Sequence, residues 1–78
     1  MVAAMEPNGL TALQHETMLF VQQYVDEHGY APSYDDIAHG LRLKARSQAH
    51  HLVSRLCERG YLRRLPHRSR ALSIVNRI

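Results

Sequence analysis

The first third of the chain carries a stripe of apolar residues that recur at spacings of three and four. Thr11 and Gln14 form the capping box that opens a helix, and Gly29 stands where helices commonly end in the left-handed conformation. The pattern therefore predicts a helix over residues 11–28. Its inward-facing residues are expected to be Leu13, Thr17, Phe20, Val21, Tyr24 and Val25.

Two shorter stretches in the middle of the chain repeat this helical spacing. Ser33 and Ser47 each precede such a stretch, and serine is a favoured N-cap because its hydroxyl accepts a hydrogen bond from a free N–H of the first turn. We therefore expect helices over 34–41 and 47–59, joined by a turn within 42–46. The residues that these helices are expected to bury are Ile37, Ala38, Leu41, Ala49, Leu52, Val53, Leu56 and Cys57.

The end of the chain has the pattern of a hairpin. Residues 61–65 and 71–75 alternate as strands do, and the polar stretch 66–70 between them is typical of a turn. The expected fold class is mainly α, with some α+β character: a three-helix winged helix-turn-helix whose wing is a two-stranded C-terminal hairpin. A chain this short holds a single core, so we expect an N-terminal arm over 1–9 and one domain over 10–78.

Acidic and basic residues separate along the sequence. Residues 1–40 contain six acids and no Lys or Arg, whereas residues 41–78 contain all ten bases and one acid. The net charge of +3 therefore combines −6 in the first half with +9 in the second. A solvated surface normally mixes both signs, so this separation indicates a basic face that binds a polyanion.

Other classes of protein fit the sequence poorly. The N-terminus lacks the regions of a secretory signal, and no stretch approaches the roughly 18 apolar residues of a membrane span, so a cytoplasmic location is expected. A single cysteine cannot form an intramolecular disulfide. His50 and His51 point roughly 100° apart on a helix, and no other pair of histidines has metal-ligand spacing, so no metal is expected. No serine lies in a nucleophile elbow, and we expect neither enzyme activity nor a cofactor.

The outward side of the 47–59 helix is polar once its core positions are removed. Ser47, Gln48, His50 and His51 can reach base edges in a major groove, and glutamine can pair with adenine through two hydrogen bonds. The expected partner is therefore double-stranded DNA. An arginine of the wing can alternatively enter the minor groove. The residues expected to contact the DNA backbone, around this helix and on the wing, are Lys44, Arg46, Ser54, Arg55, Arg68, Ser69 and Arg70.

The run from Leu10 to about Val75 resembles the N-terminal DNA-binding domain of LexA-type SOS repressors of bacteria. The Gly-x-x-Pro-[Ser/Thr] link followed by Ile-Ala is the most specific part of the likeness. The matching residues are Leu10, Thr11, Ala12, Gln14, Glu16, Gly29, Tyr30, Ala31, Pro32, Ser33, Ile37, Ala38, Leu41, Leu52, Leu56, Arg59 and Gly60.

The resemblance implies a set of base-reading residues and two departures from the family. The residues at the family's base-reading positions are Ala45, Ser47, Gln48, His50 and His51. Ser47, His50 and His51 replace the Asn and paired Glu typical of the family, so the usual SOS operator is not expected. The chain also ends where the family continues into a dimerising protease domain, and self-cleavage is not expected of it.

Two functions fit these observations. The first is a sequence-specific DNA-binding regulator of transcription, most simply a repressor that occludes a promoter. The second is a winged-helix interaction module that binds RNA polymerase or another regulator through the same basic surface. The density of polar residues suited to base edges favours the first. Because one small module covers one half-site, we expect two copies to act together, either as a homodimer that assembles only on DNA or through residues 1–9 or the wing.

Overall fold

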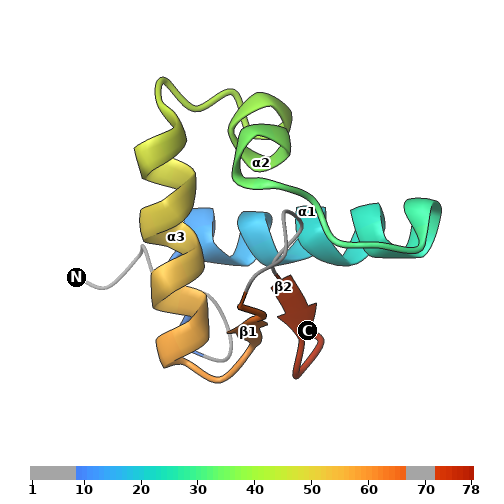
Figure 1. Cartoon of the computed structure of the whole chain (residues 1–78). Helices are drawn as coiled ribbons and strands as arrows, with labels where there is room; N and C mark the ends of the chain where they lie inside the picture. The colour runs from blue at the N-terminus through green and yellow to red at the C-terminus, as the bar shows by residue number, and fades with distance from the viewer. Residues whose placement is uncertain (1–8, 67–71) are drawn as a thin grey trace.

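In the part of the chain that the structure describes, three helices are followed by a pair of antiparallel strands (Figure 1). The computed structural model describes residues 9–66 and 72–78. These elements confirm the expected winged helix-turn-helix, with β1 and β2 as its wing. Both strands are shorter than the sequence pattern predicts. The elements are α1 (Ala12–His28), α2 (Tyr34–Gly40), α3 (Arg46–Glu58), β1 (Leu62–Arg64) and β2 (Leu72–Ile74).

The first two helices begin where their capping residues predict. Gln14 N donates to Thr11 Oγ1 at 3.1 Å, and Thr11 N donates to Gln14 Oε1 at 3.2 Å, which completes the capping box of α1. Ser33 and Asp36 make the same reciprocal pair at the start of α2, with both distances 3.0 Å. Gly29 ends α1 with φ of 82°. Both starts and the end of α1 are therefore determined by neighbouring residues in the sequence.

The third helix begins differently from the prediction. Ala45, not Ser47, is the N-cap of α3, and alanine has no side-chain oxygen to accept a hydrogen bond. Gln48 binds the N–H groups that precede the helix instead, because its Oε1 accepts from Lys44 N at 2.8 Å and from Ala45 N at 3.3 Å. The prediction of Ser47 as N-cap was wrong, and Ser47 lies exposed in the first turn.

The buried face of α1 is rotated from the predicted one. Leu13 is 42% exposed, whereas Met18, which the stripe omitted, is fully buried. Thr17 is buried as expected, and its hydroxyl donates to Leu13 O at 2.7 Å. Phe20, Tyr24 and Val25 are half-buried at the edge of the core. The core lies where the three helices and the wing meet and consists of Leu10, Met18, Val21, Ala31, Ile37, Ala49, Val53, Leu56, Leu62 and Leu72.

Residues that flank the strands of the wing extend its pairing and link it to α1. Val75 N donates to Tyr61 O at 2.8 Å, which extends the pairing beyond β1 and β2. Ile78 N donates to Gln22 Oε1 at 2.7 Å and so gives this buried α1 amide a partner. The second bond ties the C-terminal residue, just beyond β2, to α1.

The turn between α2 and α3 passes through a left-handed residue that is not glycine. Arg42 has φ of 57°. Arg42 N donates to His39 O at 3.2 Å and Leu43 N donates to Ala38 O at 2.8 Å, which is the Schellman arrangement. Glycine usually occupies this position because a side chain in the left-handed conformation is destabilising by about 1–2 kcal/mol.

Arg42→Gly is expected to be more stable than Arg42→Ala. Both variants remove the guanidinium, so their difference isolates the effect of a Cβ at positive φ. Allowing for the greater freedom of glycine in the unfolded chain, we expect a gain of roughly 0.5–1 kcal/mol in the free energy of unfolding. Urea denaturation of the two variants measures it. If the alanine variant proved the more stable, the turn would hold no backbone strain at Arg42.

Candidate nucleic-acid interface

The third helix divides lengthwise into a buried and an exposed side. Its apolar residues Ala49, Leu52, Val53 and Leu56 are buried against the other elements. In Figure 1, α3 lies along one edge of the molecule, with α2 near its first turn and the wing near its last. The predicted base-reading residues are all exposed and lie together at the N-terminal end of the helix: Ala45, Ser47, Gln48, His50 and His51.

Two of these exposed residues have contacts that change what they offer to a ligand. Both hydrogen bonds of the α3 cap use the Oε1 of Gln48, and its Nε2 is the remaining polar group of the amide. The two-bond pairing with adenine needs both the donor and the acceptor of the amide, so it would require Oε1 to leave the cap. The His50 ring packs against the Tyr34 ring of α2, with centroids 4.8 Å apart.

Two hollows border this exposed face. One lies between α2 and α3 and is lined by Tyr34, Arg46, Ser47 and His50. The other is more apolar and lies beside the first turns of α1 and α3. The exposed Leu13 is part of it. The residues that line this second hollow are Leu13, Leu43, Ser47, Gln48, His51 and Leu52.

Two arginines of α3 make only weak ion pairs. Arg46 Nε lies 3.6 Å from Asp35 Oδ1, and the Arg46 guanidinium lies 5.9 Å from the Tyr34 ring centroid. Arg55 Nη1 lies 3.2 Å from Glu58 Oε1. Such exposed pairs contribute at most about 1 kcal/mol each, so both guanidiniums can exchange their carboxylates for phosphates. Lys44 is exposed in the turn before α3. The predicted wing contacts Arg68, Ser69 and Arg70 lie outside the described residues.

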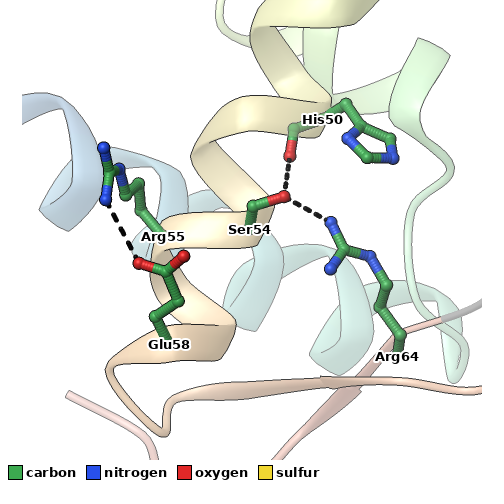
Figure 2. Close-up of polar contacts among 5 residues, drawn as sticks. All are labelled: His50, Ser54, Arg55, Glu58 and Arg64. Carbon is green, nitrogen blue, oxygen red and sulfur yellow. Dashed lines mark hydrogen bonds and ion pairs between the residues drawn. The ribbon is translucent and has the colours of Figure 1, made fainter.

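Ser54 is hydrogen-bonded to Arg64, which was not among the site residues predicted from the sequence. Its hydroxyl donates to His50 O at 3.0 Å and accepts from Arg64 Nη2 at 2.6 Å (Figure 2). Arg64 Nε also donates to the Tyr34 hydroxyl at 3.1 Å, and this hydrogen bond raises the pKa of Arg64 above its usual value. Strand alternation was the available signal, because Arg64 must face the same side as the buried Leu62.

Neither a metal cluster nor a membrane span is found within the described residues. No group of three or more His, Cys, Asp or Glu side chains among residues 9–66 and 72–78 could hold a metal ion. In the same part of the chain, no helix is long and apolar enough to cross a membrane.

Comparisons with known proteins match this domain over most of its length. The family model described as the LexA DNA binding domain matches residues 7–71. The LexA repressor of Erythrobacter litoralis is 50% identical over 66 residues, and those of Novosphingobium aromaticivorans and Gluconobacter oxydans are 44% and 42% identical over the same length. Each match covers 85% of this chain and 28% of the relative. The resemblance noted in the sequence is confirmed, and the chain belongs to the LexA DNA-binding domain family.

Proposed function

We propose that this domain binds double-stranded DNA at specific sequences, with α3 in the major groove, and acts as a transcriptional repressor. The observation that carries the proposal is the exposed polar N-terminal half of α3, set in the half of the chain with net charge +9. A major groove is about 12 Å wide and admits one helix. The names of the similar repressors agree with this role.

The proposed base readers differ in what they offer to the DNA. Ser47 and His51 have exposed side chains that can meet base edges directly. Gln48 offers its Nε2 donor, which suits an acceptor such as the O6 of guanine or the O4 of thymine. His50 reaches the groove beside Tyr34, and Ala45 contributes an apolar contact at the cap. Because these residues differ from the family's Asn and Glu residues, we propose an operator other than the usual SOS sequence.

Basic and hydroxyl side chains around α3 are proposed to hold the DNA backbone. Phosphate contacts release counterions, so the logarithm of the binding constant falls with the logarithm of salt concentration by roughly 0.9 per phosphate. A wing arginine in the minor groove is the alternative for that part of the surface. The proposed backbone contacts are Lys44, Arg46, Ser54, Arg55, Arg68, Ser69 and Arg70.

We further propose that two copies bind together, as a dimer formed on DNA. The domain is small, with Cα extents of 40 × 27 × 22 Å, and one copy covers a single half-site. The operator is then a two-fold or tandem repeat. Footprinting of the bound operator measures this, and protection of one unrepeated half-site would contradict it.

Selection from a library of random duplexes tests the function itself. Repeated rounds of binding to the purified chain are expected to enrich one sequence element. Its labelled duplex should then bind in a fluorescence anisotropy titration, and the affinity should fall steeply as salt is added. No enrichment, together with no binding at low salt, would contradict the proposal. Co-purification of RNA polymerase in that case would favour the protein-interaction module.

A further inference from the structure

One side chain joins the wing to both helices of the helix-turn-helix. Arg64 leaves β1 and places its guanidinium between Tyr34 of α2 and Ser54 of α3, at 3.1 Å from the first hydroxyl and 2.6 Å from the second. Ser54 is itself fixed by its bond to His50 O. Figure 2 shows Arg64 on one flank of α3, beneath the His50 ring, while Arg55 and Glu58 lie on the other flank. The guanidinium therefore has a defined position beside the reading face.

Among the described residues, no acid neutralises the charge of Arg64. Both of its partners are neutral hydroxyls, and within residues 9–66 and 72–78 no carboxylate is paired with it. Asp35, which follows Tyr34 in the sequence, pairs with Arg46 instead. A guanidinium has five N–H donors. Two are used by the hydroxyls, so three remain for an anion.

The surroundings of Arg64 suit a phosphate better than a base edge. Tyr34 accepts the bond from Arg64, which leaves the phenol proton to be donated to another oxygen. The Arg46 guanidinium lies 5.9 Å from the centroid of the same tyrosine ring and the His50 ring centroid 4.8 Å from it, so three nitrogen-bearing side chains lie near one tyrosine. A guanidinium binds phosphate oxygens with charge-assisted hydrogen bonds, and one that is already held in place loses less conformational freedom on binding.

We propose that Arg64 and Tyr34 form a phosphate-binding site for the DNA backbone between the wing and the helix-turn-helix. The inference rests on the proposed function and deepens it, since it adds two residues that fix how α3 lies in the groove. Ser54 is a positioning residue here, because it holds Arg64. The site contacts a phosphodiester and acts on DNA of any sequence.

Arg63 supplies a matched control for the test. Successive side chains of a strand point to opposite faces, so Arg63 lies on the other face of β1 from Arg64. Arg63→Ala and Arg64→Ala remove the same charge from the same strand. Any difference between them therefore reports the position of the guanidinium and not the net charge of the domain.

The experiment is an anisotropy titration of a short mixed-sequence duplex over a range of salt concentrations. Arg64→Ala is expected to weaken binding about tenfold, the equivalent of about 1.4 kcal/mol, and to make the salt dependence shallower by about 0.9. Arg63→Ala should change both quantities little. Arg64→Lys should keep the salt dependence but lose affinity, because an ammonium cannot span both hydroxyls. Tyr34→Phe should also lose affinity without changing the salt dependence.

The outcomes separate this inference from the function on which it rests. If the unmodified chain bound no duplex at low salt, the proposed function itself would fail. If the unmodified chain bound and Arg64→Ala matched Arg63→Ala in affinity and salt dependence, only the phosphate site would be overturned. Thermal unfolding of each variant checks that the domain is folded. If Arg64→Ala does not fold, Arg64→Lys provides the test in its place.

Discussion

Replacement of Gln48 by glutamate is expected to abolish most of the DNA affinity while leaving the domain at least as stable as before. In the present structure Gln48 Oε1 accepts hydrogen bonds from the N–H groups of Lys44 and Ala45, and a glutamate carboxylate keeps an oxygen that can accept both. A negative charge in the first turn of a helix also interacts favourably with its dipole. The Nε2 donor is lost, however, and the new charge faces the DNA. We expect a loss of roughly 1–3 kcal/mol in binding to the selected operator.

The alanine variant is the control that separates the two roles of Gln48. Gln48→Ala removes the donor and the cap together, so it should bind poorly and also lose about 1 kcal/mol of folding stability. Thermal unfolding and anisotropy titration of both variants provide the comparison. Normal operator binding by the glutamate variant would show that Gln48 does not read the DNA. Equal loss of stability in both would show that its oxygen is unimportant as a cap.

Gly40→Ala is expected to destabilise the fold by roughly 1–3 kcal/mol, although alanine normally favours a helix over glycine. Gly40 is the last residue of α2, and the Phe20 ring of α1 lies against its backbone. A Cβ at this position would come within 2.2 Å of Phe20 Cε1 and 2.4 Å of Phe20 Cζ. The ring or the helix would have to move, and a movement of the helix would displace the turn that leads into α3.

A second substitution shows whether the Phe20 ring is the cause of the destabilisation by Gly40→Ala. Leucine in place of Phe20 is smaller at the point of contact, so Phe20→Leu with Gly40→Ala should be less destabilised than the sum of the two single variants. Urea denaturation of the four proteins gives the coupling. Additive effects, or a neutral Gly40→Ala, would contradict close packing of α1 on α2 as the reason for glycine.

The starts of α1 and α2 followed from local signals in the sequence. Thr11 with Gln14, and Ser33 with Asp36, are three residues apart, so each capping box is visible without knowledge of the tertiary structure. The start of α3 was less determined, because Ser47 and Gln48 are adjacent and each has an oxygen able to cap. The turn places Ala45 at the N-cap and Gln48 at the third helical position, and the serine rule alone could not show this.

The rotation of α1 had a tertiary cause. The spacing of apolar residues favoured a stripe through Leu13 and left out Met18 and Gln22, which are both buried. Gln22 is inside because the backbone of Ile78 returns to α1 and donates to it, across 56 residues of sequence. No local pattern predicts such a partner.

The candidate interface also contains one part that local sequence patterns predict and one part that depends on tertiary packing. Exposure of Ser47, His50 and His51 follows from helical periodicity once the apolar residues of α3 are assigned to the core. The contact of Arg64 with Tyr34 joins residues 30 apart and depends on how the wing packs against the helices. Charge alone did not distinguish Arg64 from the other basic residues.

Chemical-shift mapping of the isotope-labelled chain with the selected duplex tests the use of α3 most directly. We expect the largest amide shifts from Ser47 to His51, with smaller ones at Arg64, and little change along the acidic C-terminal half of α1. The opposite distribution, with α3 unaffected and the largest shifts on α1, would mean that DNA does not contact the third helix.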